Sequence, residues 1–137
     1  MGKIESLLAK FHSTDIAVLL LRFAVGFLML FHGFNKLQHG IGGIERLVGN
    51  AHLPQFLAYG VFIGELIIPV FVILGLWTRA SALILAFNMV CAIYLAFGTK
   101  FLILNAQGGL AIELPLLFLV GSLVLIFTGG GRWSVMR

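Results

Sequence analysis

The chain has 137 residues, of which 61% are hydrophobic and 10% are charged, and its formal net charge is +4. Soluble globular domains are about 45–50% apolar and about 25% charged, so this composition excludes an ordinary soluble domain and indicates an integral membrane protein. The nine Lys and Arg residues are scattered singly between apolar segments. This scatter argues against a nucleic-acid partner and leaves the lipid bilayer as the expected one.

The first 14 residues are too polar to cross a membrane. Charged and apolar side chains are interspersed there in a way that is typical of a helix lying at the membrane interface: Lys3, Glu5, Leu7, Leu8, Lys10 and Phe11. We therefore expect an interfacial segment over residues 1–14 and a single membrane domain over residues 15–137.

Four apolar segments follow, and each approaches the ~20 residues that a helix needs to cross a ~30 Å hydrocarbon core. The predicted spans cover about residues 15–37, 54–77, 80–97 and 110–128. Since Thr78 and Arg79 alone separate the second span from the third, these two should form an antiparallel hairpin. Pro69 lies deep in the second span, where the lost backbone hydrogen bond predicts a kink. The predicted fold is all-α: a four-transmembrane-helix bundle with short connections.

The single cysteine, Cys91, lies inside the third apolar span. One thiol can form neither a disulfide within the chain nor a dithiol redox pair nor a zinc ribbon. The sequence also has no nucleotide-binding motif and no haem-ligand pair. We therefore expect no metal site and no dithiol chemistry within this chain.

The first span is apolar yet carries three basic side chains: Arg22, His32 and Lys36. An arginine near the middle of a membrane helix costs about 2.5–3.5 kcal/mol unless it meets a partner or water. The other spans offer few polar partners: Glu65, Asn88 and Glu113. These six residues are the candidate ligand-binding residues.

Depth, counted at about 1.5 Å per residue, divides the six residues into two layers. Arg22 lies about 10 Å and Asn88 about 13 Å from the predicted cytoplasmic face, and Glu65 lies about 16 Å from the opposite face. In a core of about 30 Å these three share a middle layer. We therefore predict direct or water-bridged contact between Arg22 and Glu65, with Asn88 adding a hydrogen bond. That contact either fixes which helices meet or lines a polar cavity.

The second layer lies near the outer face and comprises His32, Lys36 and Glu113. Phe31 and Phe34 flank it, and a few convergent polar groups beside aromatic rings suit a flat quinone head group or a small organic anion. The alternative is structural: His32 and Glu113 bond each other, and Lys36 extends to the lipid head groups.

The order and spacing of several short motifs resemble the DoxX family of small bacterial membrane proteins. The first span contains Leu21-Arg22, Gly26, His32-Gly33 and Lys36-Leu37. The second contains Glu65-Leu66 and Leu74-Gly75-Leu76, followed by Thr78-Arg79-Ala80, and the glycine-rich end of the fourth is followed by Arg132-Trp133-Ser134. The likeness extends over nearly the whole chain from residue 15.

This resemblance implies a four-helix protein of the bacterial inner membrane. Some family members are subunits of thiosulfate:quinone oxidoreductase or membrane anchors in redox and oxidative-stress complexes. We therefore expect an accessory subunit with quinone as its ligand and with a redox protein, or a second copy of the chain, as its partner. His32 suits this role, because an imidazole hydrogen-bonds a carbonyl and exchanges a proton near neutral pH. A small-solute or proton carrier and a purely structural membrane partner are the alternatives.

Charge asymmetry predicts that both termini lie in the cytoplasm. With four spans the termini share one side, which carries five basic residues: Lys3, Lys10, Arg79, Arg132 and Arg137. The opposite side carries three: Lys36, Arg46 and Lys100. Basic segments stay on the cytoplasmic side, so a reporter enzyme that needs the cytoplasm should be active when it is fused after Arg137. Activity of a periplasm-dependent reporter at the same position would contradict this orientation.

Overall fold

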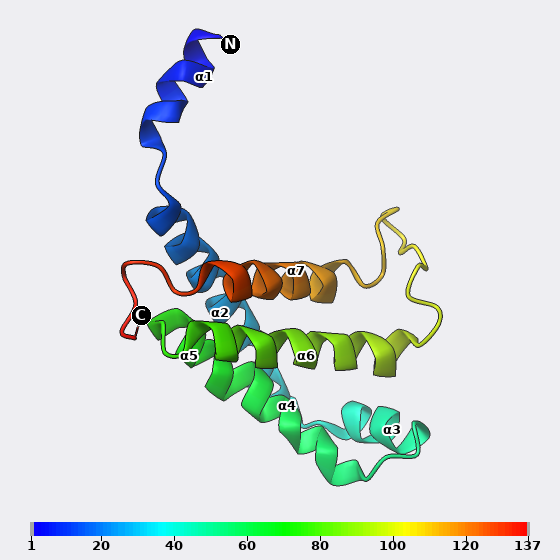
Figure 1. Cartoon of the computed structure of the whole chain (residues 1–137). Coiled ribbons are helices and arrows are strands. Elements are labelled where there is room, and N and C mark those ends of the chain that lie inside the picture. Colours follow the sequence, from blue (N-terminus) through cyan, green and yellow to red (C-terminus); the bar gives the residue numbers. More distant parts are fainter. Residues whose placement is uncertain (1, 137) are drawn as a thin grey trace.

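The computed structural model describes residues 2–136, and within them every regular element is a helix (Figure 1). Three helices are long and apolar enough to cross a membrane: Thr14–His39, Gln55–Leu74 and Thr78–Phe97. A shorter apolar helix, Glu113–Thr128, completes a set of four. The predicted all-α class is confirmed, and the arrangement is consistent with a four-helix membrane bundle.

The N-terminal segment is helical and exposed. Helix α1 (Lys3–Leu8) and the 3-10 turn Ala9–Phe11 contribute no buried residue, and Figure 1 shows them extending away from the other helices. Ser13 then caps helix α2 (Thr14–His39) by accepting a hydrogen bond from the N–H of Ile16 at 3.2 Å. The location of this segment at a membrane interface stays a prediction.

A glycine ends α2, and the chain turns into a small satellite helix. Gly40 has a φ of 82°, which is readily accessible to glycine but rare for other residues, and helix α3 (Gly42–Asn50) follows closely. Ile41 and Val48 pack with Ala58 in an apolar cluster of their own. This cluster anchors the connection to the start of the second membrane helix.

The second membrane helix is irregular ahead of its proline. It comprises a 3-10 turn (Gln55–Tyr59), α4 (Gly60–Phe62), a π-helical turn (Ile63–Ile67) and α5 (Ile68–Leu74). Pro69 has no N–H to donate to the carbonyl of Glu65 four residues earlier, and its ring would crowd that carbonyl. The wider π-helical turn accommodates both effects. The distortion expected from Pro69 therefore lies one turn earlier, at the buried glutamate.

The connection between the second and third membrane helices lies earlier in the chain than predicted: it comprises residues 75–77, not Thr78 and Arg79. Helix α5 stops at Leu74 because Gly75 adopts a left-handed conformation, and the N–H groups of Gly75 and Leu76 bond back to the carbonyl of Phe71. Thr78 and Arg79 are instead the first residues of α6 (Thr78–Phe97). The two helices still pack against each other, as a hairpin requires.

The fourth helix is shorter than predicted. Helix α7 runs Glu113–Thr128, so it begins after the expected start at residue 110, and its 16 residues span about 24 Å. Ahead of it, turns and an isolated bridge between Leu104 and Leu110 organise the chain.

Two helix pairs enclose the core. Helix α2 packs mainly on α5 and α6 mainly on α7, and the pairs cross at an angle in Figure 1. A Cβ at Gly26 would clash with Ile73 and lie 2.9 Å from the carbonyl of Pro69, so glycine permits the close approach of α2. The buried core is apolar: Val18, Val25, Met29, Ile68, Val72, Ala82, Leu85, Met89, Phe118 and Leu125. The outer faces also carry many large apolar side chains, as contact with lipid requires.

Arg22 is the polar centre of one end of the bundle. It is 1% exposed and donates four hydrogen bonds to backbone carbonyls. Nε bonds Val72 at 3.0 Å, Nη2 bonds Ile73 at 2.6 Å, and Nη1 bonds Gly130 at 2.9 Å and Trp133 at 2.7 Å. Val72 and Ile73 lie in the last turn of α5, where carbonyls lack the usual donor four residues further on and carry the negative end of the helix dipole. The carbonyl of Val72 also accepts the N–H of Gly75 at 3.3 Å. Arg22 thus joins α2, α5 and the C-terminal segment.

The predicted contact between Arg22 and Glu65 is wrong. Glu65 precedes Val72 by seven residues, or about 10 Å along a helix, so the two charges lie at different levels. The depth count placed Glu65 from the start of the second span, at the opposite face, and did not foresee that Gly75 ends the helix at Leu74 and brings the carbonyls of its last turn to Arg22. Those carbonyls accept the hydrogen bonds of the guanidinium, so Arg22 is bonded without a carboxylate.

The C-terminal segment closes the same end of the bundle. Its residues Val135 and Met136 donate backbone hydrogen bonds to the carbonyls of Leu74 and Gly75, and the N–H of Arg132 donates to Asp15 of α2 at 3.1 Å. The start of α2 and the C-terminal segment therefore share one end, as four antiparallel spans require. Arg137 lies outside the described residues, and the side of the membrane that this end faces stays a prediction.

Replacement of Arg22 tests the carbonyl network. Arg22→Ala should lower the free energy of unfolding in detergent by at least about 3 kcal/mol, because it leaves buried carbonyls without donors. Arg22→Lys should recover a minor part, since one ammonium cannot reproduce the planar fork of donors. Thermal unfolding checks both, with Arg46→Ala on the exposed face of α3 as a control of little effect. Equal stability of Arg22→Lys and wild type would contradict the network.

Candidate functional site

A buried ion pair joins the first two membrane helices toward the end of the bundle that is opposite Arg22. The Nζ atom of Lys36, in the last turn of α2, lies 2.6 Å from Oε1 and 2.5 Å from Oε2 of Glu65 in the π-helical turn. The Glu65 side chain is 5% exposed and that of Lys36 is 27% exposed. Because burial of one charge alone is costly, each side chain depends on the other.

Gly33 brings the two helices close enough for this pair to form. A Cβ at Gly33 would collide with the backbone carbonyl of Glu65, so α2 and the π-helical turn meet backbone to backbone. Lys36 lies three residues further along α2, and side chains three apart share a helix face. Long helical side chains also lean back toward the N-terminus of their helix. The ammonium of Lys36 therefore returns to the level of Glu65.

A cavity of about 150 Å³ lies next to the ion pair. Its polar lining is His32, Lys36 and Glu65, and its apolar lining is Met29, Met89, Ala92, Leu114, Pro115 and Phe118. These residues come from α2, the π-helical turn, α6 and α7, so all four membrane helices contribute to what we call the ion-pair pocket. The imidazole of His32 stands perpendicular to the ring of Phe118, with 5.8 Å between the centroids.

The ion-pair pocket offers hydrogen-bonding capacity that the protein itself does not use. Among residues 2–136, no hydrogen bond engages the ring nitrogens of the half-buried His32. An ammonium has three N–H groups, and two contacts to Glu65 leave Lys36 with a further donor. An apolar wall with a cation and a free imidazole beside it is suited to an unsaturated, oxygen-bearing ligand.

Three of the six predicted site residues lie outside the pocket: Arg22, which bonds carbonyls at the other end of the bundle, Glu113 and Asn88. Glu113 is exposed at the start of α7, and its carboxylate faces Gly109. The bond between His32 and Glu113 that the structural alternative required is therefore not formed within the described structure. Asn88 packs against Gly64, and its buried Nδ2 has no hydrogen-bond partner among residues 2–136, so it does not join Arg22 either.

Sequence reasoning missed the apolar walls of the pocket. Met29, His32 and Lys36 are spaced i, i+3 and i+7 on α2, and this spacing could have identified Met29 as a neighbour of the basic residues. Met89 and Phe118 give no such signal, because α6 and α7 are apolar on all faces and nothing in their sequences marks the inward one.

Within the described part of the chain, no group of three His, Cys, Asp or Glu side chains lies close enough together to hold a metal ion. Cys91 is a free, half-buried thiol on α6 and is not among the residues that line the ion-pair pocket. The chemistry of the pocket therefore depends on the ion pair and the imidazole.

Comparison with known proteins gives a family and two relatives. Residues 17–98, more than half of the chain, match the DoxX family, and this segment contains Arg22, His32, Lys36, Glu65 and Asn88. A Bacillus subtilis protein named "Putative oxidoreductase CatD" is 38% identical over 81 residues, which cover 59% of this chain and 60% of that protein. The match thus spans less than two thirds of that relative. A Mycobacterium tuberculosis protein named "Uncharacterized membrane protein Rv3486" is 32% identical over 135 residues, covering 88% of this chain and 80% of the relative. No solved structure matches the chain.

A double-mutant cycle tests the ion pair. Lys36→Met should lower the free energy of unfolding by about 3–5 kcal/mol, because it leaves the carboxylate of Glu65 buried alone. Glu65→Gln should cost less, since the partly exposed Lys36 can extend toward the membrane surface. The double variant should lose less than the sum of the two losses, as measured by thermal unfolding in detergent.

The matched control for this cycle is the pair Arg22→Lys and Glu65→Gln, whose losses should add because these side chains do not meet. Coupling in the control, or strict additivity of Lys36→Met with Glu65→Gln, would contradict the contacts described above.

Proposed function

This chain belongs to the DoxX family of membrane proteins, and we propose that it is an accessory membrane subunit of a quinone-linked redox complex. In this proposal the ion-pair pocket binds the head group of a quinone. The observation that carries it is the buried pair of Lys36 and Glu65 beside the unbonded imidazole of His32 in an otherwise apolar cavity.

The size and lining of the pocket suit a single quinone ring. An apolar cavity of about 150 Å³ in another protein binds one benzene molecule, and the ion-pair pocket has about the same volume. Phe118, Met29 and Met89 supply a polarisable wall of the kind that packs against flat rings. Lys36 and His32 supply donors for carbonyl oxygens, which a hydrocarbon ligand would leave unused.

A bound quinone would supply the capacity to take up two electrons and two protons and so become a quinol. The electrons would come from a redox protein partner that carries its own cofactor. The B. subtilis relative is named as an oxidoreductase, which favours a redox setting for the family segment that the two chains share.

The residues of this chain would position the ring and move protons. Lys36 would donate its third N–H to one carbonyl oxygen, while Glu65 holds the ammonium in place. His32 would donate a proton from its imidazole and recover it from solvent. A second, open cavity of about 600 Å³ borders Lys36 on the side of α3 and includes Arg46 in its lining, so water has a route to the ammonium.

The location follows from the predicted orientation. If the termini face the cytoplasm, the ion-pair pocket lies toward the outer leaflet of the bacterial inner membrane. A quinone dissolved in the bilayer would enter between the helices, and protons would exchange with the outer aqueous side.

Binding of duroquinone, a single-ring quinone without a long tail, tests the proposal. Saturating duroquinone should raise the Tm of the purified wild-type protein in detergent, because a ligand that binds only the folded state stabilises it. His32→Ala should weaken the affinity by roughly tenfold or more, as expected for the loss of one hydrogen bond in an apolar site.

Glu113→Gln is the matched control, since Glu113 lies at the same end of the bundle but does not line the pocket, and it should leave the shift unchanged. Absence of a shift in the wild type at saturating quinone would reject the quinone function. The ion pair would then be a purely structural contact between α2 and the π-helical turn.

A further inference from the structure

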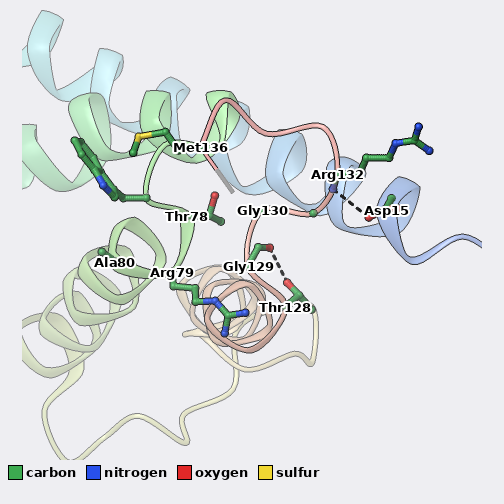
Figure 2. A pocket seen from close by; sticks show the side chains of 11 residues that line it. Asp15, Thr78, Arg79, Ala80, Thr128, Gly129, Gly130, Arg132 and Met136 are labelled. Carbon is green, nitrogen blue, oxygen red and sulfur yellow. Dashed lines mark hydrogen bonds between the residues drawn. The ribbon is translucent and has the colours of Figure 1, made fainter.

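A larger cavity, of about 870 Å³, opens at the end of the bundle where Arg22 lies (Figure 2). It is bordered by the start of α6, the end of α7 and the C-terminal segment, and we call it the α6 cavity. We propose that the α6 cavity binds a phosphate group, carried either by an anionic phospholipid of the adjacent leaflet or by a soluble phosphate ester. Nothing in the quinone function requires this site.

The start of α6 provides backbone donors. Helix α6 is 20 residues long, and its first residues Thr78, Arg79 and Ala80 line the cavity. Trp77 precedes them without a side-chain cap, and the first backbone bond of this turn is from Ser81 to Trp77 at 2.8 Å. Among residues 2–136, no acceptor bonds the N–H groups of Thr78, Arg79 and Ala80. Free N–H groups at the positive end of a helix dipole favour an anion.

The hydroxyl of Thr78 is an independent indication of a binding site. Thr78 is 4% exposed, and its buried Oγ1 has no hydrogen-bond partner among the described residues. Figure 2 shows this hydroxyl pointing into the space between the start of α6 and the C-terminal segment. Buried hydroxyls are nearly always bonded, so an unpaired one that borders a cavity indicates an acceptor that the protein itself does not provide.

Arg79 adds a full positive charge at the same place. Its Nη1 donates to the carbonyls of Ile126 and Phe127 at 3.1 and 3.4 Å, which fixes the guanidinium at the end of α7. Within the described structure, Nε and Nη2 of Arg79 have no acceptor. Arginine presents such donors in a planar fork that matches the oxygens of a phosphate.

Glycines keep the space in front of these donors open. A Cβ at Gly130 would lie 2.6 Å from Oγ1 of Thr78, and a Cβ at Gly129 would lie 3.2 Å from Nε of Arg79. A side chain at either position would therefore crowd the donors that the phosphate is proposed to meet. Asp15 also borders the cavity, but its Oδ1 accepts the backbone N–H of Arg132. The exposed ring of Trp77 gives an apolar edge of the kind found at the lipid head-group level.

The test uses the full chain in detergent and in lipid nanodiscs. Glycerol 3-phosphate is titrated against the detergent-purified protein, with binding followed as the shift in Tm. In parallel, native mass spectrometry measures how much phosphatidylglycerol, relative to phosphatidylcholine, stays bound when the protein is released from mixed nanodiscs. Preference for phosphatidylglycerol assigns the site to a lipid, and a shift with glycerol 3-phosphate alone assigns it to a soluble ester.

Two variants connect binding to the α6 cavity. Thr78→Val preserves the shape of the side chain and removes an unpaired hydroxyl, so the ligand-free protein should be at least as stable as wild type while its affinity falls about tenfold. Gly130→Ala should block the site and reduce binding to the same extent or more. Arg46→Gln, on the exposed face of α3, is the control for general loss of positive charge and should bind as wild type does.

Three results would overturn the proposal: no binding of either probe by the wild type, unchanged binding by Thr78→Val and Gly130→Ala, or an equal loss in Arg46→Gln. A marked loss of stability in ligand-free Thr78→Val would also overturn it, because the hydroxyl would then have a partner inside the folded protein.

Discussion

The guanidinium of Arg22 is the interaction on which the rest of the bundle depends. A buried cation in an apolar helix must be stabilised by polar partners, and here four backbone carbonyls provide them in place of a carboxylate. Because those carbonyls lie at the end of α5 and in the C-terminal segment, one side chain fixes how α2, α5 and the segment after α7 meet. Helix ends are well suited to this, since their free carbonyls already carry partial negative charge. Arg79 likewise donates hydrogen bonds to the carbonyls of Ile126 and Phe127 at the end of α7.

Because backbone carbonyls bond Arg22, Glu65 is available for an ion pair at the other end of the bundle. With Arg22 satisfied by the backbone, the acidic side chain pairs with Lys36, and the apolar core that includes Met29 and Leu85 separates the two charged regions. The ion-pair pocket and the α6 cavity have no lining residue in common. Substitutions at one should therefore leave the other intact, which is what allows their functions to be examined independently.

Proline, glycine and glutamate cooperate to build the pocket. The missing N–H of Pro69 weakens the helix at Glu65, the π-helical turn accommodates the defect, and Gly33 lets α2 approach the carbonyl there. A regular helix with a larger residue at position 33 would hold Lys36 and Glu65 further apart. Local backbone irregularity inside a membrane is tolerated where protein surrounds it, and π-helical turns recur at functional sites for the same reason.

The sequence by itself determined the class of this protein, its four apolar helices, and the short set of polar residues from which the site is drawn. Composition and apolar run length suffice for this, because crossing a bilayer constrains them directly. The tertiary structure alone decided which residues pair. Counting residues gives the level of a Cα atom, but Lys36 reaches Glu65 because its side chain leans back along α2 and Gly33 lets the helices touch. Arg22 likewise meets carbonyls, because Gly75 ends α5 early and exposes them, a consequence of packing and backbone conformation that no count of charges contains.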